Sequence, residues 1–330
     1  MLIALTGAIG DVVRALPLLG RIRHGRPEAH VTWVVEPPSA PLLAGHPWLD
    51  EVIVFPRAQG VRGFMATLRR VRAGRPDVAL DLGRGAKTAL LVLGSGAKTR
   101  LGFARADARE GSWLAATRHL PAQGAAPAKI AQFLAFGDLL ELPPVPVEFG
   151  LAPTAAERAD AESLTSGLPR PIVAACLGSS CPSRRWFPEA TAAALSDIAA
   201  RHGASGVLLG TAADAAFAAE VARATRATTR DLTGRTSLRQ LMAVLARADV
   251  AFGPDSGALH VAAAVGTPVV SLWGATSADR SAPYGSERHT IHGDAPCAPC
   301  FLRDCPIGRV CMRAISPESV VGQALEALAA

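Results

Sequence analysis

The first candidate for chemistry is an aspartate in a glycine turn near the start of the chain. Residues 6–11 read Thr-Gly-Ala-Ile-Gly-Asp and connect a short apolar run to a helical pattern. Glycine lets a ligand approach the backbone closely. The first turn of a helix also offers unpaired N–H groups at the positive end of its dipole. Two roles are open to Asp11: it caps the helix, or it lies at the mouth of a ligand site and accepts a proton from a hydroxyl group.

A second turn of the same kind lies late in the chain. Residues 253–260 read Gly-Pro-Asp-Ser-Gly-Ala-Leu-His, again between an apolar run and a helical pattern. Backbone N–H groups converge around Asp255, Ser256 and Gly257, and such a nest fits a diphosphate. His260 follows one turn into the helix, where it either makes a structural hydrogen bond or faces the same ligand.

Four cysteines gather near the end of the chain. Their thiolates could hold Zn²⁺ tetrahedrally, although the spacing of the second pair is not a standard finger pattern. Free buried thiols and a regulatory disulfide are the alternatives, and a cytoplasmic setting disfavours the disulfide. The candidate metal ligands are Cys297, Cys300, Cys305 and Cys311.

Alternating apolar runs and helical patterns supply the elements that must hold these turns. This alternation is the βαβ rhythm of a parallel, doubly wound α/β sheet, and ligand sites in such sheets lie where strands turn into helices. The predicted strands are 2–5, 30–35, 52–55, 78–82, 171–176, 206–209, 250–253 and 269–273. The predicted helices are 11–23, 63–72, 87–93, 129–140, 188–201, 212–224, 237–246, 257–265 and 317–328.

A proline cluster at 143–146 divides this rhythm into two halves. It is the best candidate for a linker, and 330 residues suit two domains. We therefore expect domains at 1–146 and 147–330 that face each other across a cleft. The last helix packs either within the second domain or back toward the first.

The charge of the chain favours anionic partners. The net charge is +6 and the sequence pI about 9.4, which suits phosphorylated sugars, nucleotides or anionic lipid surfaces, although genome base composition also explains an arginine excess. Arg69, Arg70 and Arg72 form a basic cluster that is either a solvated helix face or a contact for an anionic ligand. The sequence has no pattern of a secretory signal or a membrane span. We expect a cytoplasmic protein, with peripheral attachment to the inner membrane left open.

Taken together, these motifs resemble the heptosyltransferases, the family 9 glycosyltransferases. The opening Gly-Ala-Ile-Gly-Asp-Val-Val-Arg-Ala-Leu-Pro is similar to the start of that family, and residues 252–264 are similar to its donor-binding signature. Residues 178–188 resemble its Lys-Arg-Trp-Pro segment, and residues 232–238 are also similar. The motifs stand in family order over almost the whole chain.

The resemblance implies two Rossmann-like domains of the GT-B type and inverting transfer that needs no metal or other cofactor. Asp11 would be the catalytic base. Asp214 would contact the ribose and Asp255 the sugar. The other implied donor contacts are Ser179, Ser180, Arg184, Ser256, Gly257 and His260. Arg184 replaces the usual Lys and Asp214 the commoner Glu, which puts the identity of the donor in doubt.

The acceptor side of the resemblance lies in the first domain. Residues 100–103 and 108–110 look like the acceptor region of enzymes that act on the acidic Kdo sugars. Gly10 and Arg109 join the basic cluster Arg69, Arg70 and Arg72 as acceptor-binding candidates.

The implied reaction moves a heptose from ADP-heptose to the Kdo or first heptose of the lipopolysaccharide core. A family member that uses another nucleotide-sugar and a non-catalytic nucleotide-sugar or glycolipid-binding protein are the alternatives. Asp11 favours an enzyme, because a binding module would not need a carboxylate in that turn. No nucleic-acid partner is expected, and the absence of a full Gly-x-Gly-x-x-Gly fingerprint argues against an oxidoreductase.

Overall fold

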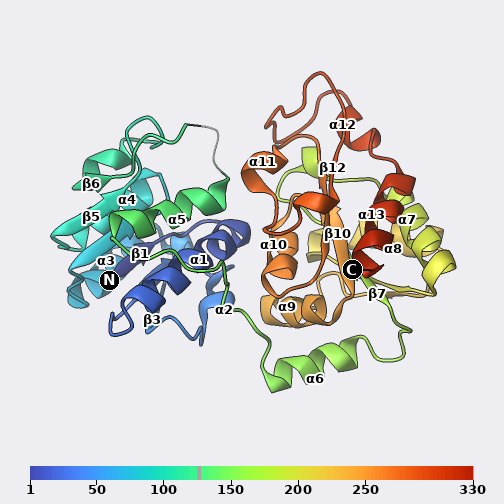
Figure 1. The fold of residues 1–330 in the computed structure, drawn as a ribbon, viewed down its shortest axis with the longest axis horizontal. Helices are drawn as coiled ribbons and strands as arrows, with labels where there is room; N and C mark the ends of the chain where they lie inside the picture. The colour runs from blue at the N-terminus through green and yellow to red at the C-terminus, as the bar shows by residue number, and fades with distance from the viewer. Residues whose placement is uncertain (125–127, 330) are drawn as a thin grey trace. The chain divides into compact units, whose positions relative to one another are not determined.

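The computed structural model describes residues 1–124 and 128–329, which form two compact units. The units are Met1–Leu151 and Ala152–Ala330, so the chain passes from one to the other shortly after the proline cluster. Each unit contains a six-stranded sheet in which every paired strand runs parallel to its neighbours (Figure 1). Two doubly wound α/β units are the predicted fold class.

The sheet of the first unit changes direction next to its first strand. In spatial order its strands are β3 (Glu51–Val54), β2 (Thr32–Val35), β1 (Leu2–Ala4), β4 (Val78–Asp81), β5 (Thr99–Gly102) and β6 (Arg118–His119). The chain winds outward from β1 to β3 and then returns to pair β4 with β1. A ligand site is expected at such a reversal, beyond the carboxyl ends of the strands.

Helices cover both faces of this sheet. Helices α1 and α5 pack together on one face, and α3 and α4 pack together on the other (Figure 1). In α1 the side chains of Val12, Leu16, Leu19 and Ile22 form an apolar stripe at helical spacing that is fully buried, which explains why the helix forms there. The bounds are α1 (Ile9–Gly25), α2 (Ala40–Leu43), η1 (Arg57–Gln59), α3 (Gly60–Ala73), α4 (Ala86–Gly94), η2 (Ser112–Ala115) and α5 (Lys129–Leu139).

The second unit repeats the plan, with its reversal between β10 and β7. In spatial order the strands are β12 (Thr290–His292), β11 (Val269–Trp273), β10 (Val250–Pro254), β7 (Ile172–Cys176), β8 (Ser205–Leu209) and β9 (Thr229–Asp231). The four inner strands are buried along their whole length. That burial explains why they read as continuous apolar runs.

Helices surround this second sheet as well. The last helix, α13, packs against α7, β10 and β11, inside the second unit. The bounds are α6 (Ala155–Leu164), η3 (Pro182–Arg184), α7 (Pro188–His202), η4 (Ala212–Asp214), α8 (Ala215–Ala224), α9 (Leu238–Arg247), α10 (Gly257–Ala264), α11 (Ala278–Ser281), η5 (Glu287–His289), α12 (Val310–Arg313) and α13 (Pro317–Ala329).

Helix α6 was not predicted, although the sequence carries a signal for it. Thr154 and Glu157 form a capping box, in which each side chain accepts a hydrogen bond from the backbone of the other residue. Glu157 also receives two hydrogen bonds from Arg239 of α9, at 2.6 and 2.7 Å. These bonds from Arg239 lower the pKa of Glu157 to about 2, and the pair ties α6 to α9.

Within the described residues, no helix has the length and apolar character needed to cross a bilayer.

Candidate functional site

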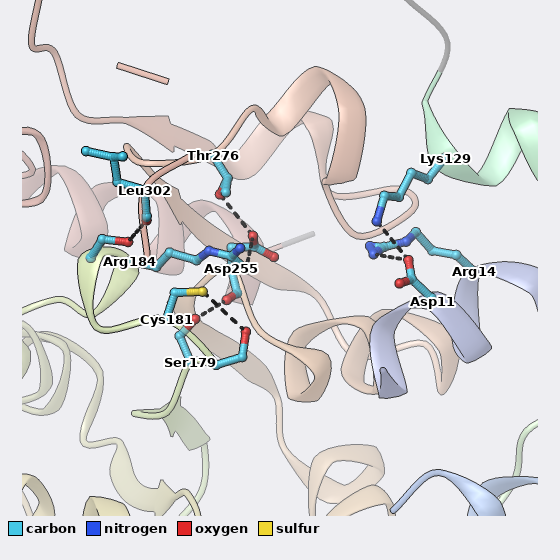
Figure 2. Close-up of polar contacts among 11 residues, drawn as sticks. Asp11, Arg14, Lys129, Ser179, Cys181, Arg184, Asp255, Thr276 and Leu302 are labelled. Atoms are coloured by element: carbon cyan, nitrogen blue, oxygen red, sulfur yellow. Dashed lines mark hydrogen bonds and ion pairs between the residues drawn. The ribbon is translucent and has the colours of Figure 1, made fainter. Parts of the chain in front are cut away.

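Asp11 lies in the first turn of α1, just beyond the carboxyl end of β1. The helix starts at Ile9 with Ala8 in the capping position, so Asp11 is not the capping residue. Its Oδ1 instead accepts hydrogen bonds from Lys129 Nζ at 2.9 Å and Arg14 Nη2 at 3.0 Å (Figure 2). The first unit therefore holds a carboxylate between two cations at the reversal of its sheet.

The electrostatics of Asp11 keep its carboxylate ionised. Burial raises the pKa of Asp11, but the positive charges and hydrogen bonds of Arg14 and Lys129 outweigh it and hold the pKa below its ordinary value. Both bonds end on Oδ1, and no described residue donates a hydrogen bond to Oδ2. A Cβ at Gly7 would stand 3.7 Å from Oδ2, so the glycine turn passes directly beside that oxygen. Oδ2 is thus the atom that can accept a proton.

Sequence reasoning did not identify Lys129, although two signals pointed to it. It is the first residue of α5, and a cation at the positive end of a helix is unfavourable unless something offsets it. It is also one of only three lysines, beside 31 arginines. Arg14 could have been found from its spacing, since it lies three residues after Asp11 on the same helix.

Other charged side chains follow the neighbouring strands at the same edge of the sheet. Arg84, after β4, donates to Gln132 Oε1 at 2.5 Å and lies over the ring of Phe103. The backbone N–H of Arg109, after β5, donates to the Arg84 carbonyl at 2.8 Å. Arg109 is exposed, so its predicted acceptor contact is compatible with its place near the Asp11 turn.

Gly10 and Asp81 also belong to this edge. Gly10 is buried in the first turn of α1 and offers only backbone; its contact with an acceptor stays a prediction. Asp81 ends β4, level with Ala4 of β1. Burial raises the pKa of Asp81 to about 6, against opposing hydrogen bonds from Thr88 and the loop backbone. Asp81 was not predicted; its bonds hold the loop that follows β4.

The structure separates the basic cluster of α3 from the Asp11 turn. Arg70, in the last turn of α3, pairs with Glu51 at 2.7 Å. Glu51 begins β3 and is level with Thr32, which is in turn level with Leu2 at the start of β1. The last turn of α3 therefore lies at the amino edge of the sheet, whereas Asp11 lies at the carboxyl edge. The structure therefore gives no support to Arg69, Arg70 and Arg72 as contacts of an acceptor bound at Asp11.

In the second unit, the predicted donor residues meet around Asp255. Asp255 Oδ2 accepts hydrogen bonds from Arg184 Nη1 at 3.0 Å and Thr276 Oγ1 at 2.9 Å (Figure 2). Ser179 Oγ donates to the Asp255 carbonyl at 2.8 Å. These residues follow β7, β10 and β11, three neighbouring strands of the sheet. The Asp255 side chain is only 11% exposed, so its charge depends on Arg184. Thr276 was not predicted as a site residue.

The start of α10 is suited to an anion. Ser256 occupies the capping position but its side chain makes no capping bond. Its Oγ is buried and has no hydrogen-bond partner among the described residues. The unpaired N–H groups of the first turn begin at Gly257. An unsatisfied buried hydroxyl in this position is costly unless a ligand completes it. His260 is buried one turn further along α10, and its predicted donor contact remains untested.

Asp214 and Ser180 occupy different settings. Asp214 is 2% exposed; its Oδ2 accepts bonds from the backbone and hydroxyl of Thr211, both at 2.8 Å. Its Oδ1 lies 2.6 Å from Arg185 Nη2, in an ion pair that lacks hydrogen-bond angles. The carboxylate is thus engaged within the protein, and its contact with a ribose stays a prediction. Ser180 is exposed in the loop after β7 and could turn toward a ligand.

Close backbone packing fixes the strands that carry this site. A Cβ on Gly253 would lie 2.3 Å from the Cys176 carbonyl oxygen of β7. A Cβ on Gly178 would lie 2.7 Å from Asp214 Oδ2. At Gly253 the clash is with backbone, so only glycine fits there, whereas a side chain at Gly178 would require the Asp214 carboxylate to shift.

The four C-terminal cysteines lie in a segment that contacts the Arg184 loop. Ser183 Oγ donates to the Leu302 carbonyl at 2.6 Å, and Arg309 Nη1 donates to the Arg185 carbonyl at 2.9 Å. All the cysteines of the described chain are free thiols. No three His, Cys, Asp or Glu residues in 1–124 and 128–329 are arranged to hold a metal ion. The zinc site of Cys297, Cys300, Cys305 and Cys311 stays a prediction without structural support, which elemental analysis of the purified protein would decide.

Comparison with known proteins now adds an independent observation. Residues 64–311 match the family model described as glycosyltransferase family 9 (heptosyltransferase). The chain belongs to glycosyltransferase family 9. Its membership in this family confirms the predicted resemblance, and it makes the chain a glycosyltransferase rather than an oxidoreductase.

Similar family 9 proteins come from several bacteria. The chain is 26% identical to the lipopolysaccharide core heptosyltransferase OpsX of Haemophilus influenzae, over 84% of this chain and 80% of that protein. It is 28% identical to lipopolysaccharide heptosyltransferase 1 of Pseudomonas aeruginosa, over 92% and 87%. The solved structure of the ADP-heptose LPS heptosyltransferase II of Escherichia coli has the same fold, with a TM-score of 0.79 at 23% identity over 99% and 98% of the two chains.

Proposed function

We propose that this glycosyltransferase moves a heptose from ADP-heptose to the inner core of lipopolysaccharide, with Asp11 as the base. The observation that carries the proposal is the Asp11 carboxylate, held ionised by Lys129 and Arg14 with Oδ2 open beside a glycine turn. The names of the similar proteins support the donor and the acceptor. They include lipopolysaccharide heptosyltransferases and an ADP-heptose LPS heptosyltransferase.

On the donor side, the start of α10 would receive the diphosphate. The Ser256 hydroxyl and the first N–H groups of α10 need an acceptor, and phosphate oxygens provide one. Arg184 pairs with Asp255, and we expect its guanidinium to turn toward the diphosphate or to share its donors with it. Its planar fork suits a phosphate. These groups would stabilise the negative charge that ADP acquires as it leaves.

On the acceptor side, Asp11 would take the proton of the attacking hydroxyl group. The acceptor oxygen forms a bond to the anomeric carbon, the bond from that carbon to the diphosphate oxygen breaks, and ADP leaves with the electron pair. The hydroxyl proton passes to Asp11 Oδ2. A carboxylate with a lowered pKa is a weak base toward a free alcohol, so the transfer suits a late stage, when bond formation has already made the hydroxyl acidic.

The same geometry favours a single displacement that needs no metal. Asp11 serves as a base, and the scheme has no covalent enzyme intermediate, so the anomeric configuration inverts. Arg184 and the positive end of α10 supply the charge stabilisation that the diphosphate needs. We accordingly propose metal-independent, inverting transfer.

The proposed acceptor would bring the reaction to a membrane surface. Lipopolysaccharide core is carried on a lipid, so we propose that the protein works in the cytoplasm at the surface of the inner membrane. A non-catalytic binding protein would not need Asp11, and a member that uses a different sugar would keep the same base and diphosphate site.

A donor panel tests the proposal. Purified protein is incubated with ADP-heptose, ADP-glucose, UDP-glucose and GDP-mannose, each with a Kdo-bearing lipid acceptor and with one that already carries the first heptose. Mass spectrometry of the acceptor should show one added heptose from ADP-heptose alone, and the two acceptors decide which position is used. Transfer from another donor would contradict the heptose assignment, and no transfer from any donor would favour the binding protein.

A further inference from the structure

One face of the first unit carries a group of exposed apolar side chains. Helices α3 and α4 cover the face of the sheet opposite α1 and α5 (Figure 1), and the short η2 packs against α4. Five apolar side chains of these elements are between 40% and 78% exposed. We call this surface the α3–α4 face; its apolar members are Val61, Met65, Leu90, Leu93 and Leu114.

These side chains lie on neighbouring elements and form one surface; they are not isolated exposed apolar residues. Val61 and Met65 are four residues apart on α3, and Leu90 and Leu93 are three apart on α4, so each pair shares a helix face. The helices touch closely: a Cβ on Gly94 of α4 would lie 2.5 Å from a methyl group of Leu68 of α3. Helix α4 also packs against η2, which carries Leu114. Single exposed apolar residues need no explanation, but a contiguous group marks an interaction site.

The helices of this face carry charges of one sign, and two of these cations, Arg70 and Lys87, pair with Glu51 and Glu36 of neighbouring segments. Helices α3 and α4 and η2 contain four arginines and one lysine and not a single Asp or Glu. Within residues 1–124 and 128–329, Arg62, Arg69 and Arg72 form no ion pair, and all three are exposed. Arg69 and Arg72 continue the stripe of Val61 and Met65 along α3 at helical spacing. By contrast α1, α5, α7, α8 and α13 each contain at least one acid.

Exposed apolar residues interleaved with arginines fit one partner best. A phosphate-rich polymer would account for the arginines but not for five exposed aliphatic side chains, and an apolar protein groove would not account for the uniform charge. At a bilayer surface, apolar side chains enter the acyl boundary while cations meet anionic headgroups. We propose that the α3–α4 face docks the protein on an anionic membrane surface. This inference rests on the proposed function, because the acceptor is then a lipid.

Docking also gives the basic cluster a role that its position allows. Arg69 and Arg72 lie toward the amino edge of the sheet, away from the Asp11 turn. On the α3–α4 face they would contact lipid phosphates instead of the acceptor sugar.

Vesicle co-sedimentation tests the docking face with two pairs of substitutions. Val61→Gln with Leu114→Gln removes the two most exposed apolar side chains. Arg62→Gln with Arg69→Gln removes two cations. Wild-type protein should bind phosphatidylethanolamine–phosphatidylglycerol vesicles and bind phosphatidylcholine vesicles weakly. The charge pair should lower the partition coefficient on anionic vesicles at least about tenfold, given the typical contribution of each cation near an anionic surface. The apolar pair should weaken binding as well.

Matched controls come from the second unit. Arg223→Gln with Arg226→Gln removes two exposed arginines, and Phe301→Gln with Ile307→Gln removes two exposed apolar side chains. Neither control should change vesicle binding, and circular dichroism and thermal unfolding confirm that each variant folds. Equal losses in controls and test variants would overturn the proposal. Sensitivity to the arginine pair alone, together with equal binding to a soluble polyanion, would overturn it in favour of a polyanionic partner.

A short, water-soluble acceptor without lipid chains separates this inference from the proposed function. Test variants should retain wild-type transfer to the soluble acceptor and lose transfer to acceptor embedded in vesicles. Loss of transfer to both would place the face in the acceptor site and overturn the docking role. If wild-type protein transferred no heptose to any acceptor yet bound vesicles through this face, the proposed function would fail and the docking surface would stand.

Discussion

The Arg184–Asp255 pair allows a quantitative prediction for donor binding. Replacing Arg184 with alanine removes a charge-assisted hydrogen bond to the diphosphate, which is typically worth about 1.5–3 kcal/mol, or roughly a 10- to 150-fold rise in the ADP dissociation constant. The structure points to the upper half of that range. Asp255 is largely buried and depends on Arg184 and Thr276, so without Arg184 its uncompensated charge would repel the diphosphate.

Two further variants separate charge from geometry. Arg184→Lys keeps the charge and should bind ADP within several-fold of wild type, since a point charge can still reach a phosphate. Asp255→Asn removes the repulsion and frees Arg184, so ADP should bind as tightly as in wild type or more tightly. The interaction energy between Arg184 and Asp255 comes from comparing the double variant with the two single variants, because the effects of two residues in contact do not add.

Isothermal titration calorimetry with ADP is the assay, and the chain provides its own control. Arg170 pairs with Asp249 at the amino end of the same sheet, far along the strands from the Asp255 turn. Arg170→Ala should leave the ADP dissociation constant unchanged. An unchanged constant in Arg184→Ala, or equal weakening in Arg170→Ala, would refute the assignment of Arg184 to the donor.

Three other predictions follow from the geometry. Lys129→Gln removes one of the two cations beside Asp11, so the pKa of Asp11 should rise. The acid limb of the kcat/KM profile should then move to higher pH. An unmoved limb would mean that Lys129 does not tune the base. Burial raises the pKa of Asp81 to about 6. The protonated Asp81 carboxyl therefore stabilises the folded protein fully below pH about 4, the ordinary pKa of an aspartate, and this stabilisation is lost as the pH rises through about 6. Relative to Asp81→Asn, wild-type protein should lose about 3 kcal/mol of unfolding free energy over that window, measured by urea unfolding at several pH values; parallel pH dependence in both proteins would contradict it. Gly253→Ala should destabilise the second unit by about 1–3 kcal/mol or more because its Cβ meets the β7 backbone. Gly322→Ala is the control, because Gly322 lies on the exposed side of α13 with open space around it. This substitution should stabilise the protein by up to about 1 kcal/mol. Similar changes in stability in Gly253→Ala and Gly322→Ala would refute the packing argument.

The elements that could be predicted from the sequence are those that show as runs or regular spacings of apolar residues. The buried inner strands β7, β8, β10 and β11 read as apolar runs, and the helices between them show a buried stripe. The polar edge strands β9 (Thr-Arg-Asp) and β12 (Thr-Ile-His) did not stand out. An edge strand is held by its backbone pairing and needs no apolar run. The inner strand β5 (Thr-Arg-Leu-Gly) contains a single apolar residue, so it shows no apolar run.

The candidate site was predictable to the extent that it depends on turns. Glycines and acids at the ends of apolar runs marked Asp11 and Asp255, because the strand-to-helix turn both positions and exposes them. The residues that pair with these acids were harder to predict. Lys129 is 118 residues from Asp11, and only the packing of α5 on α1 brings them together. The edge of the sheet at which the α3 arginines lie could not be predicted for the same reason. Their number suggested an anionic ligand, but the direction of the helix decides which edge of the sheet they reach.

The role of Asp11 is tested most directly by comparing Asp11→Asn with wild type in single-turnover transfer from ADP-heptose, alongside titration of ADP. The amide keeps the size of the side chain but cannot accept the proton, and general-base catalysis typically contributes about 10²–10⁴-fold to a rate. We expect the rate to fall by at least about 10²-fold while the dissociation constant for ADP stays nearly unchanged. Transfer at the wild-type rate by Asp11→Asn, in protein that binds ADP normally, would contradict the assignment of Asp11 as the base.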